Sequence, residues 1–100
     1  MTIRHVVLWK LAADDAQTRD AQAAELVRRL HALVGVVPSI RALSAGVNAA
    51  YPDGNSDVAL VVDVDDLQGL EDYQVHPAHQ ELVGFVRSIV SGRMAVDFEV

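Results

Sequence analysis

The sequence contains no cysteine, and this absence removes several kinds of chemistry at once. A disulfide framework, a thiolate metal site and a cysteine nucleophile all need the missing side chain. Such a chain suits a reducing compartment, so we expect a cytoplasmic protein. Only 5% of the residues are aromatic, although 51% are hydrophobic, because valine and alanine supply most of the apolar mass. This composition is typical of a folded domain and argues against an intrinsically disordered chain.

Long apolar runs and basic clusters are missing as well. The longest apolar stretches, such as Val58–Val62, are far too short to cross a bilayer. The net charge of −6 argues against nucleic acid and anionic membranes as partners. Residues Met1–His5 lead directly into a strand-like pattern, without the charged and apolar regions of a signal peptide. We therefore expect a soluble protein with neither nucleic acid nor a membrane as its partner.

Four strands are predicted from short runs rich in valine, leucine and aromatic residues. The clearest is Asp57–Val64, and the segment after Ser91-Gly92 alternates between apolar and polar residues. The predicted strands are Ile3–Lys10, the looser Ile40–Asn48, Asp57–Val64 and Arg93–Val100.

Three helices are predicted between these strands. The first, Ala16–Val34, has apolar residues at spacings of three and four, and Gly35 ends it. The second is short and ends near Gln74, with Gln68 placed to close a capping box on Asp65. The third is Pro77–Val90, because proline suits the first turn of a helix.

The order of the elements indicates an α+β fold. It is β-α-β-β-α-β with the second helical region split in two, which is the ferredoxin-like arrangement of an antiparallel sheet with helices on one face. A chain of 100 residues has room for one core, so residues 1–100 are expected to form a single domain.

Both faces of this sheet are predicted to be apolar. In the strand 57–64 the even positions are all apolar, yet Ala59 and Val61 on the opposite face are apolar too. Val6 and Leu8 repeat the pattern in the first strand. Since the helices cover one face only, we expect a second copy to cover the other, which predicts a homodimer through the open sheet face. The alternative, a C-terminal segment folded over the sheet as a lid, fits the alternation of that segment less well.

Three segments carry a resemblance to a known family. The stretches Ile3–Lys10 (IRHVVLWK) and Asp72–His79 (DYQVHPAH), together with the closing Asp97-Phe98, resemble the stress-responsive dimeric A/B barrel proteins. This resemblance implies a dimer whose two sheets form a barrel, with a pocket between sheet and helices in each protomer. The family includes a plant polyketide cyclase. By that likeness His79 is the base and Tyr73 its hydrogen-bonding partner in closing a ring on a linear polyketide without a cofactor.

The residues themselves support a histidine-lined pocket. Pro77 at the first helical position makes His76 the N-cap and places His79 in the first turn, on the same stripe as Leu82. The positive end of the helix dipole disfavours an imidazolium there, so His79 is expected to stay neutral and to accept a proton. Tyr73, at the end of the preceding helix, is placed to offer its hydroxyl to the same cavity.

Further residues are expected to line this pocket. His5, Val7 and Trp9 share one face of the first strand. Val58 and Leu30 stand where the resemblance to the plant cyclase would place a histidine and a tyrosine, which makes this pocket less polar. The predicted ligand-binding residues are His5, His76, Val7, Trp9, Val58, Leu30 and His31. His31 shares an apolar stripe, where a single histidine is usually a satisfied core residue.

Competing functions remain open at the level of sequence. Tyr73 and His79 could hydrogen-bond one another in a non-catalytic stress or structural protein. A cofactor-free monooxygenase is a third possibility, by analogy of fold alone. His76 and His79 could share a cation with Asp72 or His5, but only the histidine pair is visible, so neither a metal nor another cofactor is expected.

Overall fold

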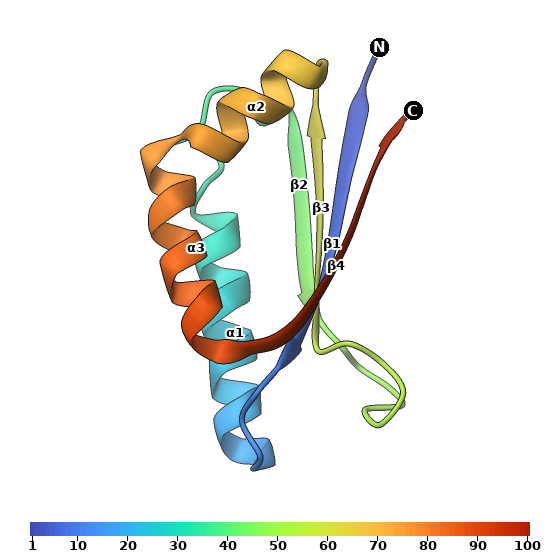
Figure 1. Cartoon of the computed structure of the whole chain (residues 1–100), viewed down its shortest axis with the longest axis vertical. Helices are drawn as coiled ribbons and strands as arrows, with labels where there is room; N and C mark the ends of the chain where they lie inside the picture. Colours follow the sequence, from blue (N-terminus) through green and yellow to red (C-terminus); the bar gives the residue numbers. More distant parts are fainter.

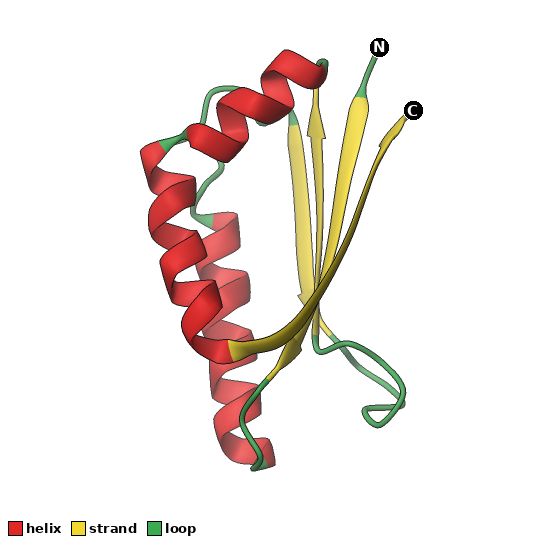
Figure 2. Cartoon of the chain, in the orientation of Figure 1, coloured by secondary structure: helices red, strands yellow, loops and turns green.

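A computed structural model describes all of residues 1–100 and contains one antiparallel sheet with three helices. The elements are β1 (Ile3–Leu11), α1 (Ala16–His31), β2 (Ala42–Val47), β3 (Val58–Val64), α2 (Leu67–Val75), α3 (Pro77–Ile89) and β4 (Val90–Glu99). The strand order in the sheet is β2-β3-β1-β4. All three helices lie on one side of the sheet, and no element covers the other side (Figures 1 and 2). The predicted ferredoxin-like α+β fold is confirmed.

The core lies between the helices and the inner face of the sheet. In β1 and β3 alternate residues are buried, and the antiparallel register sets Val7 opposite Leu60, so that both point towards the helices. Leu26 and Leu30 of α1 are fully buried against this face. Burying a leucine stabilises a fold by about 1.5–3 kcal/mol, so the apolar stripes decide which face the helices cover.

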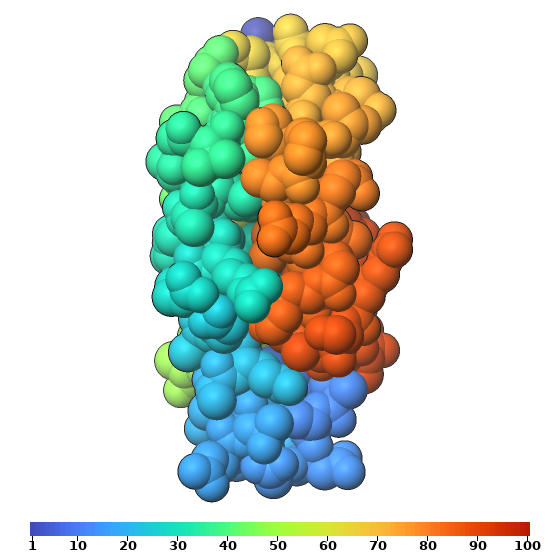
Figure 3. Space-filling view, turned by 90° about the vertical axis from the view of Figure 1, so that its left-hand side faces the viewer, coloured from blue at the N-terminus to red at the C-terminus, as the bar shows by residue number.

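The helices α1 and α3 lie side by side over the sheet, as the space-filling view in Figure 3 shows. Across their contact the guanidinium carbon of Arg29 lies 3.9 Å from the centre of the Phe85 ring. Such cation–π contacts add modest stability at a partly exposed site. The helical layer is therefore continuous, and α3 forms one wall of the space above β1.

The prediction for the end of α1 was three residues too long. The helix ends at His31, and residues 32–39 form turns in which the Leu33 N–H donates to the Leu30 carbonyl and the Val36 N–H to the Leu33 carbonyl. Gly35 has a φ of +83° within this turn, a conformation that glycine adopts without strain. Leu33 and Val37 reach the core from the turn, so burial continues although the helix does not.

The predicted capping box of α2 and the predicted start of β4 need correction. The cap of α2 is Asp66, which accepts a hydrogen bond from the Gly69 N–H at 2.8 Å, while the Gln68 amide donates to Asp72 and forms no capping box. The pair Ser91-Gly92 does not separate α3 from β4 as predicted: α3 ends at Ile89, and β4 begins at Val90 and continues through the pair, with a shift of register between Lys10 and Leu11. An irregularity of that kind bends a strand without ending its pairing.

The outer face of the sheet is exposed and largely apolar. Side chains at alternate positions of β4 lie opposite those of β1, with Leu8 facing Met94 and Val6 facing Val96. The exposed fractions are 37% for Leu8, 69% for Met94, 55% for Val96 and 44% for Phe98. A charged pair joins the two central strands: the Arg4 guanidinium donates to both oxygens of Asp63, at 2.8 and 2.9 Å. We call this surface the open sheet face.

Candidate functional site

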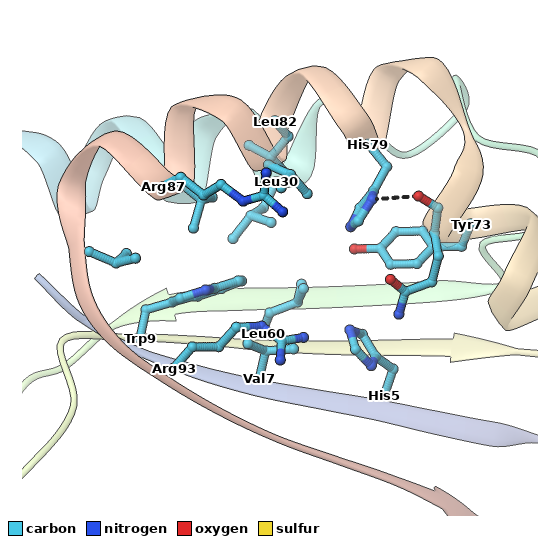
Figure 4. Close-up of a pocket in the computed structure, with 14 residues that line it drawn as sticks. His5, Val7, Trp9, Leu30, Leu60, Tyr73, His79, Leu82, Arg87 and Arg93 are labelled. Carbon is cyan, nitrogen blue, oxygen red and sulfur yellow. Dashed lines mark hydrogen bonds between the residues drawn. The ribbon is translucent and has the colours of Figure 1, made fainter.

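A cavity of about 340 Å³ lies between α3, the end of α2 and the inner face of β1 and β4 (Figure 4). Its walls are mostly apolar, and its polar groups are few. The lining residues are His5, Val7, Trp9, Leu30, Leu60, Tyr73, Gln74, His79, Leu82, Val83, Val86, Arg87, Val90 and Arg93. A concave, mainly apolar space with a small number of polar groups is typical of sites for small organic molecules.

His79 presents one ring nitrogen to this cavity. Its Nδ1 lies 3.0 Å from the Gln74 carbonyl oxygen, which can only accept, so we infer that Nδ1 carries the proton. In a neutral ring Nε2 is then an acceptor, and Figure 4 shows it turned towards the cavity. Burial lowers the pKa of His79 from its ordinary value of 6.5, and nearby positive groups lower it further. The side chain is therefore equipped to accept a proton near neutral pH.

Tyr73 is fully buried, and its hydroxyl has no hydrogen-bond partner in the protein. Figure 4 shows this hydroxyl pointing into the cavity beside His79. The two rings pack with centres 4.4 Å apart, but they share no hydrogen bond: His79 Nδ1 pairs with Gln74 and the Tyr73 hydroxyl pairs with no group. The predicted hydrogen bond between Tyr73 and His79 is therefore wrong. Burial raises the pKa of Tyr73 to about 12, so the group is a neutral donor at physiological pH.

Trp9 supplies a second donor without a partner. Its side chain lines the cavity and is 5% exposed, and its Nε1–H donates to no group of the protein. Leaving a buried donor unsatisfied costs about 1–3 kcal/mol, so native proteins rarely keep two of them in one cavity without a use. The cavity thus offers hydrogen bonds that its own walls do not use.

His5 also lines the cavity, and it is held by a carboxylate. Its Nδ1 lies 2.5 Å from Oδ1 of Asp97, its partner in the register of β1 and β4. A carboxylate oxygen accepts, so Nδ1 is the donor of this contact. The His5 and Tyr73 rings pack edge to face with their centres 5.8 Å apart. Asp97 lies 92 residues from His5 in the chain, and sequence reasoning did not pair the two.

The structure brings six of the predicted site residues together. His5, Val7, Trp9, Leu30, Tyr73 and His79 all line the cavity, and three others do not. His76 caps α3, with its Nδ1 accepting from the Ala78 N–H at 3.1 Å, which confirms its predicted position in the helix but leaves it outside. Val58 is buried in the core away from the lining. The expectation that His31 is a core residue is wrong, because α1 ends there and the side chain is exposed.

Sequence reasoning missed three polar residues of the lining: Gln74, Arg87 and Arg93. Arg87 follows His79 by eight residues, a spacing that places both on one face of α3, and this signal was available. Arg93 lies opposite Trp9 in the register of β1 and β4, on the same inward alternation as Asp97. The alternation indicated a shared face, but the distant pairing that turns this face towards the cavity was not predictable from local pattern.

Two further features of the structure concern metal ions and membranes. No group of three or more histidine, aspartate or glutamate side chains is arranged to hold a metal ion. No helix combines the length and the apolar character needed to cross a membrane.

Comparison with known proteins agrees with this architecture. A dimeric protein of unknown function with a ferredoxin-like fold from Bacteroides fragilis is 25% identical, with a TM-score of 0.89 over 99% of this chain and 96% of its own. A dimeric ferredoxin-like protein of unknown function from Thermobifida fusca is 27% identical, with a TM-score of 0.86 over 100% and 92%. The hydroxynitrile lyase of Passiflora edulis has the same fold at 11% identity, with a TM-score of 0.80 over 99% and 93%.

No curated protein sequence matches the chain. The family model of the stress responsive A/B barrel domain matches residues 3–100, which is nearly the whole chain and the same family that its sequence resembles. The chain belongs to the stress responsive A/B barrel domain family.

Proposed function

We propose that the cavity binds a small organic molecule and that His79 and Tyr73 carry out acid–base chemistry on it without a cofactor. The observation that carries this proposal is the pair of buried, unpartnered donors, Tyr73 and Trp9, beside a histidine with a free acceptor nitrogen. The reaction class is that of a lyase or a cyclase, and a polyketide-like chain is one suitable substrate. The hydroxynitrile lyase of the same fold supports the class by analogy of architecture alone.

The roles of the two side chains follow from their protonation. His79 is neutral because burial disfavours its charged form, so Nε2 takes a proton from a carbon or hydroxyl next to a carbonyl or nitrile group. Tyr73 keeps its proton and donates a hydrogen bond to the oxygen on which negative charge develops. The Trp9 indole N–H, on the other side of the cavity, is a donor for a second polar group of the ligand.

Both reaction classes balance with these groups. In the lyase direction Nε2 removes a hydroxyl proton, the adjacent carbon–carbon bond breaks, and the leaving carbanion is protonated by the imidazolium. In the cyclase direction Nε2 removes a proton from a carbon between two carbonyls, the enolate attacks a distant carbonyl, and the alkoxide takes the proton back. Apolar walls exclude water, which strengthens each of these polar contacts.

We also propose that two copies associate through the open sheet face. Val96 and Phe98 are about half exposed there, and helices cover only the other face. A standard interface buries about 800 Å² on each partner, which an exposed four-stranded sheet can supply. The Bacteroides and Thermobifida proteins are both described as dimeric, which supports this assembly.

The acid–base proposal is tested with two probe reactions. We would measure cleavage of mandelonitrile, through the absorbance of benzaldehyde, and aldol ring closure of a linear 3,5,7-triketo ester, through the absorbance of the cyclic product. Wild-type protein is expected to accelerate at least one of them. His79→Gln should lower that rate about 10²–10⁴-fold, the usual contribution of a general base.

The control for this experiment is His31→Gln, which changes an exposed histidine at the end of α1 in the same way. Its rate should equal that of wild type, while Tyr73→Phe should lower the rate without preventing the protein from folding. A wild-type protein that accelerates neither reaction, and whose cavity residues respond to no compound of a fragment screen followed by NMR, would contradict the proposal and favour a structural role.

A further inference from the structure

The charge of the cavity is opposite to that of the whole chain. The protein carries a net charge of −6, yet the cavity lining includes Arg87 and Arg93 and no aspartate or glutamate. With neutral histidines the lining is therefore formally positive. Such a local reversal of sign raises the concentration of anions at the site relative to the rest of the surface.

These two arginines are also the ones that lack partners. Arg4 and Arg41 each bind an aspartate, and Arg28 and Arg29 both bind Glu25. Arg19 donates to two backbone carbonyls. Neither Arg87 nor Arg93 makes a hydrogen bond or an ion pair within the chain, although acidic residues outnumber basic ones by 14 to 8.

The two guanidinium groups come from opposite walls of the same cavity. Arg87 extends from α3 and Arg93 from β4, and Figure 4 shows both reaching into the space between these elements. Both residues are exposed, whereas Tyr73 and Trp9 are buried, and Figure 4 shows the two guanidinium groups between Trp9 on one side and Tyr73 with His79 on the other. Two like charges facing one gap are repelled by each other and attract an anion between them.

We propose that the molecule bound in this cavity is a small organic carboxylate, whose anionic group lies between Arg87 and Arg93. Its apolar body then extends past Val7 and Val86 towards the Tyr73 hydroxyl. Arginine suits this role because its planar guanidinium matches the two oxygens of a carboxylate. The inference rests on the proposed function of the cavity as a ligand site and specifies the class of ligand.

The positive charge of Arg93 also acts on the groups deeper in the cavity. It opposes the rise that burial causes in the pKa of Tyr73, and it adds to the lowering that burial causes in the pKa of His79. A carboxylate held by the arginines would therefore bring the rest of the ligand within range of these residues.

The experiment compares benzoate with benzamide, which has nearly the same shape but no charge. Trp9 is the only tryptophan of the chain and lines the cavity, so its indole N–H signal in a proton–nitrogen NMR spectrum reports binding there directly. Benzoate is expected to shift this signal with a Kd about ten-fold or more below that of benzamide, since hydrogen bonds to charged groups are worth about 1.5–3 kcal/mol.

Arg87→Gln and Arg93→Gln should each weaken benzoate binding towards the benzamide value and leave benzamide binding unchanged. The matched control is Arg41→Gln, which removes the same charge from an arginine outside the cavity that binds Asp65. It should change the affinity for neither compound, which separates a local contact from the general effect of net charge.

The remaining outcomes are also decisive. Equal affinities for benzoate and benzamide, or benzoate binding unaffected by both arginine substitutions, would overturn the carboxylate inference while leaving the cavity as a ligand site. Absence of any shift of the Trp9 signal at millimolar concentrations of both compounds would overturn the inference together with the ligand site on which it rests. Acceleration of either probe reaction by a protein that does not prefer benzoate would leave the acid–base proposal intact and reject the carboxylate alone.

Discussion

Replacing Tyr73 by phenylalanine removes a single oxygen atom from a side chain that is fully buried and lines the cavity. A buried tyrosine hydroxyl usually contributes about 0.5–1.5 kcal/mol through its hydrogen bond, and its loss destabilises the fold. The Tyr73 hydroxyl has no such bond to lose, and its desolvation opposes folding. We therefore expect the free energy of unfolding of Tyr73→Phe to be unchanged or raised by up to about 1 kcal/mol.

The assay is urea unfolding followed by Trp9 fluorescence, together with thermal melts at one fixed protein concentration, since association would make the melting temperature depend on concentration. A gain of about 1 kcal/mol corresponds to a rise of about 4–8 °C for a domain of this size. The control is Tyr51→Phe, the same chemical change at a side chain that is 80% exposed, which should alter stability by less than about 0.5 kcal/mol.

The refuting result is a loss of more than about 1 kcal/mol in Tyr73→Phe that Tyr51→Phe does not share. It would mean that the hydroxyl has a structural partner and is not held free for a ligand. If Tyr73→Phe keeps its stability but loses activity in the probe reactions, the hydroxyl serves function at a cost in stability.

Three further predictions concern other parts of the molecule. Phe98→Asp on the open sheet face should give a monomer or an aggregate in sedimentation at micromolar concentration, and a well-folded wild-type monomer would contradict the proposed dimer. In NMR titration His79 should have a pKa below about 6.5, because burial disfavours its charge, and a value above about 7 would refute a neutral base. Because the pKa of His79 is lower in the folded state, that state binds fewer protons than the unfolded state. The contribution of His79 to stability is therefore complete above the unfolded pKa and is lost as pH falls through the folded pKa. Asp66→Ala should cost about 1 kcal/mol in urea unfolding through the lost cap of α2, and equal stability of variant and wild type would show that the cap contributes nothing.

The fold was predictable from sequence because its signals are local and repeated. Alternation in 57–64 and the spacing of three and four in α1 set the type of each element, and the order of the elements allowed few topologies. The apolar residues on both faces of the central strands indicated a sheet that needs a second cover. Helix ends were less predictable. The helix α1 stops at His31, and the turn that follows buries Leu33 just as a further turn of helix would, so the apolar spacing does not mark the end.

Part of the site could also be predicted from local sequence patterns. Pro77 and His76 fixed the beginning of α3, and the helical period then turned His79 inwards. The alternation of β1 set His5, Val7 and Trp9 on one face. These features depend on a few neighbouring residues and on the fixed geometry of helices and strands, so the sequence alone determined them.

Only the tertiary structure decided which polar groups find partners. His5 meets Asp97 because β1 and β4 pair in one particular register across most of the chain, whereas the Tyr73 hydroxyl finds no partner at all. Arg87 and Arg93 share one cavity because α3 and β4 form its opposite walls. Pairing of this kind depends on the relative positions of distant elements. The packing of the whole core sets these positions, so local sequence patterns do not predict them.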